Sequence, residues 1–338
     1  MSAGRRSRWL LVAVFLAGLI AGWWMGRGNV LREIALWWQN RDAVVAPTHE
    51  LVRSSFGDAI YAGNLEAREL EEVSGLAHSA QHPNRLWAIN DSGGEPALYA
   101  LGHDGGAHGK VRVQEAENVD WEALARFEYE GAPYLLIGDI GDNLAVRDHV
   151  SFYAVAEPRF EDDTLPRDAS APLAFRIDAR YDEGPRDAEA MAIDPLAQQI
   201  LILSKRSQPP ELYALSLEPG EKGAIRTAQR LGRVETLPAP NARDLEEGGF
   251  LGRFRSQPTA LRISEDGKSA IVLTYKHAYE YPRQAGESWV EAFARSPREI
   301  PLPPLHQAEA AALEPGTGAL WVTSENHPAP LFRVPHRP

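Results

Sequence analysis

Short apolar runs recur along the chain from about residue 55 to the C-terminus, and glycine and proline residues separate them. No long amphipathic helical pattern interrupts this succession. Short runs bounded by turn-forming residues are typical of β-strands. The pattern therefore predicts an all-β domain over residues 55–338.

Five segments of this domain share one pattern, in which polar and apolar residues alternate before a short apolar stretch. Each is followed at nearly constant distance by an apolar strand that ends in polar residues, with turn signals such as Asp266-Gly267 between the two. Repeated strand hairpins of this kind are typical of β-propeller blades. The five segments are residues 72–77, 120–125, 187–192, 257–262 and 307–312.

The two ends of the domain bear on the number of blades. The last unit stops after its third strand, while residues 58–62 form a strand candidate that precedes the first unit. Pairing the two would remove an open sheet edge. We therefore predict five blades, with the ring closed by an N-terminal strand. Six blades are the alternative, because residues 244–246 echo the start of a repeat.

Each repeat begins with two polar residues at positions i and i+2, which point to the same face of a strand. The first strand of a propeller blade lines the central axis, so we expect carboxylates to converge near one end of it. Like charges raise one another's pKa values, and a positive group is expected among them. The pairs are Glu72 and Ser74, Asp120 and Glu122, Asp187 and Glu189, Gln257 and Thr259, and Gln307 and Glu309.

Two kinds of positive group fit this prediction. A hard divalent cation such as Ca²⁺ takes several oxygen ligands, and Glu72, Asp120, Glu122, Asp187, Glu189 and Glu309 are the candidates. Alternatively, Lys205, Arg206 and Lys276 follow second strands and are placed to act as internal partners. A purely structural role for the acids and direct binding of a cationic ligand also stay open.

Polar loops follow the second strands. The run Gly-Asp-Ile-Gly-Asp-Asn at 138–143 adds Asp139 and Asp142 as candidate metal ligands, although a tight turn held by Asx hydrogen bonds explains it equally well. The corresponding loops of other units complete the set of candidate ligand-binding residues. These are Asn90, Asp91, Lys205, Arg206, Tyr275, Lys276, Glu325 and Asn326.

The sequence contains no nucleophile elbow, zinc-protease motif, phosphate-binding loop or dinucleotide fingerprint. Carboxylates with separated pKa values can act as general acid and base, which makes Glu122, Asp187 and Glu189 catalytic candidates. His306 joins them because it directly precedes the fifth acidic segment. The other isolated histidines, including His78, are expected on the surface or in turns.

The first 28 residues bear on location. A basic cluster of Arg5, Arg6 and Arg8 precedes an uncharged stretch over 9–26, close to the shortest length that spans a bilayer. This predicts a single-pass inner-membrane anchor with a cytoplasmic N-terminus and a periplasmic propeller; secretion after signal cleavage is the alternative. Residues 29–54 are expected to form a juxtamembrane linker or an interfacial helix.

Charge and cysteine content restrict the partners. The net charge of -12 argues against nucleic-acid binding, and the absence of cysteine excludes disulfides and cysteine-ligated zinc. The inner membrane and an unknown small molecule or protein are the expected partners.

The segments 90–93, 120–122, 138–143 and 187–190 resemble signatures of uncharacterised exported bacterial propellers, which are distantly similar to phytase-like and NHL-type propellers. The resemblance covers residues 70–334. A phytase-like relationship implies calcium and phosphate-ester hydrolysis. The sequence as a whole predicts a membrane-tethered binding or scaffold module with an acidic central channel. The alternative is a divalent-metal-dependent hydrolase of phosphoesters, esters or lactones.

Overall fold

The computed structural model describes residues 51–161, 163–166, 168–221, 223–325 and 327–337. All of them belong to one compact unit, Val44–Pro338. The expected membrane segment at 1–28 and most of the linker at 29–54 lie outside the described residues. Within the described part, the structure has no helix that is both long and apolar enough to cross a membrane.

Each sequence repeat opens an antiparallel meander. The first consists of β2 (Val73–His78), β3 (Arg85–Asn90), β4 (Ala97–Gly102) and β5 (Ala107–Val113), and β9 (Ala169–Ala171) pairs in parallel with β5. The second consists of β6 (Trp121–Tyr129), β7 (Ala132–Asp139), β8 (Val150–Ala156) and β10 (Leu173–Tyr181). The third consists of β11 (Ala188–Asp194), β12 (Gln199–Ser204), β13 (Glu211–Ser216) and β14 (Ile225–Arg233). Strands β10 and β14 pair in parallel, so the second and third meanders share one eight-stranded sheet.

The fourth meander consists of β15 (Pro258–Ile263), β16 (Ser269–Thr274), β17 (Ala278–Pro282) and β18 (Arg298–Ile300). The last consists of β19 (Ala308–Leu313), β20 (Leu320–Ser324) and β21 (Pro330–Val334), to which β1 (Ile60–Asn64) adds as the outer strand. The described helices are α3 (Ala242–Gly248), the 3₁₀ helix η1 (Gly249–Phe254) and α4 (Trp289–Phe293). The fold is thus mostly β, as the strand-like runs predict.

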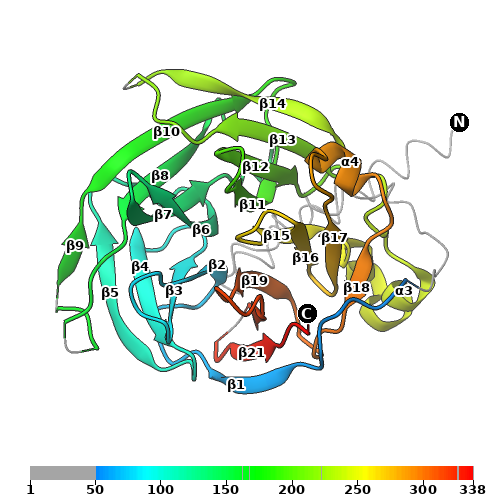
Figure 1. The fold of residues 1–338 in the computed structure, drawn as a ribbon, viewed down its shortest axis with the longest axis horizontal. Helices are drawn as coiled ribbons and strands as arrows, with labels where there is room; N and C mark the ends of the chain where they lie inside the picture. The colour runs from blue at the N-terminus through cyan, green and yellow to red at the C-terminus, as the bar shows by residue number, and fades with distance from the viewer. Residues whose placement is uncertain (1–50, 162, 167, 222, 326, 338) are drawn as a thin grey trace, which may run out of the picture. The chain divides into compact units, whose positions relative to one another are not determined.

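The first strands of the five meanders surround a common axis. Strand β2 contacts β6, β6 contacts β11, β11 contacts β15, β15 contacts β19, and β19 contacts β2 again. Figure 1 shows the remaining strands of each meander lying progressively further from this centre. The described domain therefore has the arrangement of a β-propeller, with the repeat starts at the axis.

The two ends of the described domain meet in one sheet. Strand β1 pairs antiparallel with β21, with Ile60 opposite Arg333 and Asn64 opposite Pro330. The predicted closure by an N-terminal strand is confirmed. The segment 244–246, which resembles a repeat start, lies in helix α3 and begins no meander.

Apolar side chains fill the spaces between neighbouring sheets. One cluster joins Leu76 and Leu86 of the first meander to Ala310 and Trp321 of the last. Another joins Leu136 of the second to Met191 of the third. Each sheet packs its two faces against the neighbouring sheets. Closing the ring therefore also buries both faces of the sheet in which β1 pairs with β21.

An arginine occupies the axis where the other inner strands carry alanine. The Arg262 side chain of β15 donates hydrogen bonds to the backbone carbonyls of Leu76 (3.1 Å), Met191 (3.0 Å) and Ala311 (2.6 Å), which belong to β2, β11 and β19. Burial lowers the pKa of Arg262 to about 10. A single guanidinium thus joins four inner strands across the axis. The alanines at the matching repeat position are Ala77, Ala125, Ala192 and Ala312.

Candidate metal centre

All five inner strands share a bulge near their first residues. In each, the register against the second strand shifts by one residue, which leaves one residue of the inner strand without an opposite partner. A bulge turns the side chain of the extra residue away from the regular alternation. The extra residue is the second polar residue of each predicted pair: Ser74, Glu122, Glu189, Thr259 or Glu309.

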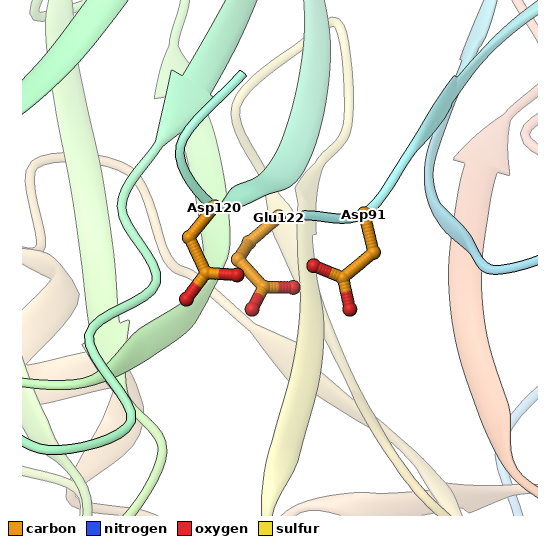
Figure 2. Close-up of side chains that lie close together, drawn as sticks. All are labelled: Asp91, Asp120 and Glu122. Atoms are coloured by element: carbon orange, nitrogen blue, oxygen red, sulfur yellow. The ribbon is translucent and has the colours of Figure 1, made fainter. Parts of the chain in front are cut away.

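Three carboxylates come together at the start of β6. Asp120 and Glu122 flank the first residue of this strand, and Asp91 directly follows β3 of the preceding meander. Each offers one oxygen, and these oxygens all lie within 4.8 Å of one another. Figure 2 shows the Glu122 carboxylate between the other two. The sequence predicted Asp120 and Glu122 as metal ligands and placed Asp91 among the ligand-binding residues.

Glu122 is the most constrained member of this acidic triad. It is only 4% exposed, and its Oε1 has no hydrogen-bond partner among the described residues. Burial, followed by the charges of Asp91 and Asp120, holds the pKa of Glu122 well above its ordinary value. Leaving a buried carboxylate oxygen unpaired is costly, so the geometry calls for a donor or a cation at this point.

Gly141, in the loop after β7, lies against two of these carboxylates. A Cβ built at this residue would lie 2.4 Å from Asp120 Oδ2 and 2.7 Å from Glu122 Oε1. Any side chain here would press on the two carboxylates. The absence of a side chain at this glycine therefore lets the loop pass close to the two carboxylates without displacing them.

The chemistry of the triad fits a hard divalent cation. Calcium binds oxygen ligands at about 2.3–2.6 Å, so two ligands on opposite sides of one ion are separated by about 5 Å. The oxygens of the triad meet this limit. Carboxylates of Asp91, Asp120 and Glu122 would hold the ion, and its charge would offset their mutual repulsion.

Two acidic residues at the start of the third meander form ion pairs with basic side chains of the same protein. Glu189 Oε1 forms an ion pair with Lys205 Nζ, and Asp187 Oδ2 forms one with Arg206 Nε at 2.6 Å. Asp187 Oδ1 also accepts a hydrogen bond from the Asp142 N–H at 2.9 Å. The predicted internal compensation is thus present for these two acids.

Lys276 differs from this expectation. Its Nζ lies 3.3 Å from Asp244 Oδ1 and 2.5 Å from Glu247 Oε2, both on helix α3. The prediction that it compensates the channel acids is wrong, because the long stretch before β15 folds into an acidic helix that binds it.

Asp139 and Asp142 serve the loop between β7 and β8. Asp139 Oδ1 accepts hydrogen bonds from the Asp120 N–H at 3.1 Å and from Arg147 Nη1 at 2.7 Å. Asp142 accepts from the N–H groups of Val146 and Arg147 at 2.9 and 2.8 Å. The Asp142 bonds lie within the loop, as the turn alternative expects, whereas Asp139 ties the loop to the start of β6. The acidic triad includes neither residue.

The remaining candidates lie around the same end of the inner strands. Asn90 Oδ1 accepts from the Glu72 N–H at 3.0 Å, and the Glu325 N–H donates to the Gln307 carbonyl at 3.1 Å. Glu309 Oε1 accepts from Gln307 Nε2 at 3.4 Å. These contacts hold the loops at the repeat starts.

Three other residues complete the sequence predictions. The Tyr275 ring lies 5.1 Å from Lys205 Nζ. His306 is exposed in the segment before β19. Asn326 lies outside the described residues.

Sequence reasoning misplaced His78 and overlooked Arg262. His78 is buried at the end of β2, beside His103 and Trp321, so the expected surface position is wrong. Arg262 is the only charged residue at a repeat position that otherwise holds alanine. An alignment of the five repeats reveals this arginine as the exception among four alanines.

No protein-family model matches the chain, and no curated protein matches it. Similar solved structures include a chain of a nidogen/laminin complex, with 12% identity, a TM-score of 0.39 and coverage of 75% of this chain and 73% of that one. The PQQ-bound aldose sugar dehydrogenase of Streptomyces coelicolor is 10% identical with a TM-score of 0.41, covering 86% and 99%. Glutaminyl cyclase of Myxococcus xanthus is 14% identical with a TM-score of 0.44, covering 84% and 97%. The propeller arrangement itself follows from the cyclic contacts among the five inner strands.

Proposed function

We propose that this protein is a propeller binding module that holds one divalent cation, of the calcium type, at the start of β6. The observation that carries the proposal is Glu122, a buried carboxylate set between Asp91 and Asp120 with an oxygen that has no partner among the described residues. A cation at this point satisfies that oxygen and removes the repulsion among the three acids. Calcium fits best because all three donors are carboxylates.

The proposed ring has five blades. Five meanders with five inner strands in cyclic contact support this number, and so does the pairing of β1 with β21. The helical conformation of residues 244–246 removes the sequence support for a sixth unit.

The proposed location is the periplasmic face of the inner membrane, with an anchor at residues 1–28 and the propeller outside the cytoplasm. The basic cluster ahead of the uncharged stretch 9–26 supports this orientation. In this setting the domain acts as a tethered binding module for a small molecule or protein.

A metal-dependent hydrolase is the second candidate. The observation that favours it is the raised pKa of Glu122, because a carboxyl whose pKa burial raises is a better general acid than an ordinary one. Hydrolysis of p-nitrophenyl phosphate, p-nitrophenyl acetate or a simple lactone by the purified chain, dependent on Ca²⁺ and lost in Glu122→Gln, would establish it. Absence of turnover with Ca²⁺ bound leaves the binding module as the function.

Thermal unfolding of the full chain in detergent tests the cation site. Adding Ca²⁺ should raise the Tm progressively, because a ligand that binds only the folded state stabilises it by mass action. Glu122→Gln should abolish the shift. The matched control is Glu128→Gln, which changes an exposed residue of the same strand and should leave the shift intact. A parent protein whose Tm responds to neither Ca²⁺ nor Mg²⁺ would overturn the proposal.

A further inference from the structure

The chain enters the described domain along the outer strand of the fourth meander. The Ser54 N–H donates to the Glu299 carbonyl at 2.9 Å, and the Glu299 N–H donates to the Val52 carbonyl at 2.9 Å, so this segment pairs with β18. It then reaches the last meander, where the Gly57 N–H donates to the Pro335 carbonyl at 2.7 Å. Figure 1 shows the segment leading into β1, the outermost strand of that meander. The first described residues are therefore fixed to the outer side of the domain.

Three large apolar side chains of this entry segment are exposed. Val52 is 71% exposed, and Ile60 and Tyr61, at the start of β1, are each 56% exposed. Because β1 is the edge strand of its sheet and successive side chains point to opposite faces, Ile60 and Tyr61 flank the outer edge from both sides. Arg53 Nη2 donates to Asp58 Oδ1 at 2.6 Å, which links the residues beside Val52 to those just before β1. We call Val52, Ile60 and Tyr61 the apolar rim.

Exposed arginines accompany the apolar rim. They are Arg53, Arg298 of β18, and Arg337, whose backbone bonds to the entry segment. The acids on the same stretch are Asp58 and Glu299. This leaves a small positive excess at the rim of a chain whose net charge is -12. Apolar side chains together with basic ones are typical of surfaces that bind anionic membranes.

The connection to the predicted anchor favours a lipid surface as the occupant of this rim. Residues 29–50 join the anchor to the described domain, and even fully extended they span at most about 75 Å. A tether of this length raises the effective concentration of the domain at the bilayer. The tether meets the domain at Leu51, which packs against the apolar cluster between the third and fourth meanders. The apolar rim, beginning one residue later, is thus the exposed surface that follows the tether most directly.

We propose that the apolar rim docks shallowly on the lipid surface in which the chain is anchored, with Tyr61 at the level of the headgroups. The inference rests on the proposed membrane location. Shallow docking fits an edge strand, because its free backbone groups need water, which the hydrocarbon core lacks. Tyrosine suits this level, since its ring is largely apolar and its hydroxyl stays hydrated. Docking holds the propeller in one orientation, whereas a tether alone lets it turn.

Fluorescence quenching in nanodiscs tests this inference. The chain contains no cysteine, so Tyr61→Cys and Val52→Cys each accept a single environment-sensitive label. The matched control is Leu231→Cys, which labels an exposed apolar position of the outer strand β14. The full chain is reconstituted in nanodiscs of phosphatidylethanolamine and phosphatidylglycerol that contain a nitroxide lipid. Quenching at the two rim positions should be about two-fold stronger than at the control, and strongest with the nitroxide near the headgroup.

A second substitution and two further outcomes complete the test. Ile60→Glu should remove the quenching of the label at position 52, because a carboxylate disfavours contact with the anionic lipids, while Ile225→Glu in β14 should not. Equal quenching at positions 61 and 231 would overturn the proposal. So would a label at position 61 that is shielded from water but not quenched by lipid, since a protein partner then covers the rim. A chain that fails to assemble with nanodiscs would instead contradict the membrane location itself, and this inference with it.

Discussion

Replacing Arg262 by methionine removes the side chain that joins the inner strands across the axis. Its guanidinium donates to carbonyls of Leu76, Met191 and Ala311, one on each of three other inner strands. Methionine retains much of the apolar volume but offers no donor. The substitution therefore leaves three buried carbonyls without these hydrogen bonds.

The magnitude follows from two opposing contributions. A buried acceptor that loses its donor costs about 1–3 kcal/mol, so three of them cost about 6 kcal/mol at the middle of that range. Burial lowers the pKa of Arg262 to about 10, which means that the buried charge itself costs the fold about 3 kcal/mol. Methionine removes that cost. The expected net loss in the free energy of unfolding is about 3 kcal/mol, a large share of the stability of an ordinary domain.

Urea unfolding followed by tryptophan fluorescence measures this loss. The control is Arg298→Met, which changes an exposed arginine of β18 and should alter stability by less than about 0.5 kcal/mol. Arg262 lies three residues beyond the bulge residue of its strand, about 10 Å further along the axis, so Arg262→Met should keep the calcium response. A variant as stable as the parent would refute the view that the guanidinium braces the ring.

Three further predictions concern titration and access. Without a divalent cation, stability should fall as pH rises from about 4.5 toward the raised pKa of Glu122, since only the folded state holds that proton; denaturation curves of Glu122→Gln should lack this slope. Gly141→Ala should weaken Ca²⁺ binding about ten-fold by calorimetry, because its Cβ would crowd Asp120 and Glu122, and an unchanged affinity would disprove the role of the glycine. Burial and His103 lower the pKa of His78 to about 3, so stability should decline as pH falls from 6.5 toward 3. In His78→Phe the urea midpoint should depend less on pH over this range, and an identical dependence would contradict the assignment.

The alternation of apolar and polar residues was sufficient to predict the strands near the axis. Each repeat start became an inner strand, and the closure by β1 follows from the incomplete last unit. Register within a hairpin depends on side-chain pattern and short turns, both of which are visible in sequence. The outer strands were harder to predict, because β10 and β14 pair in parallel across two meanders.

The site was predicted only in part, because bulges and neighbouring sheets decide which acids meet. The sequence treated six carboxylates as equivalent, whereas Asp187 and Glu189 have basic partners from the end of β12. Asp91 completes the triad from another meander, a contact that no local pattern encodes. The space left by Gly141 likewise depends on loop geometry that residue spacing does not determine.

Calorimetric titration of Ca²⁺ into the full chain tests the central claim most directly. The cation site built by Asp91, Asp120 and Glu122 predicts one ion per chain for the parent and for Glu128→Gln, and no binding for Glu122→Gln. Without Ca²⁺, Glu122→Gln should also be the more stable protein, because it no longer buries a repelled carboxylate. Binding that survives in Glu122→Gln, or a parent that takes up no ion, would contradict the account.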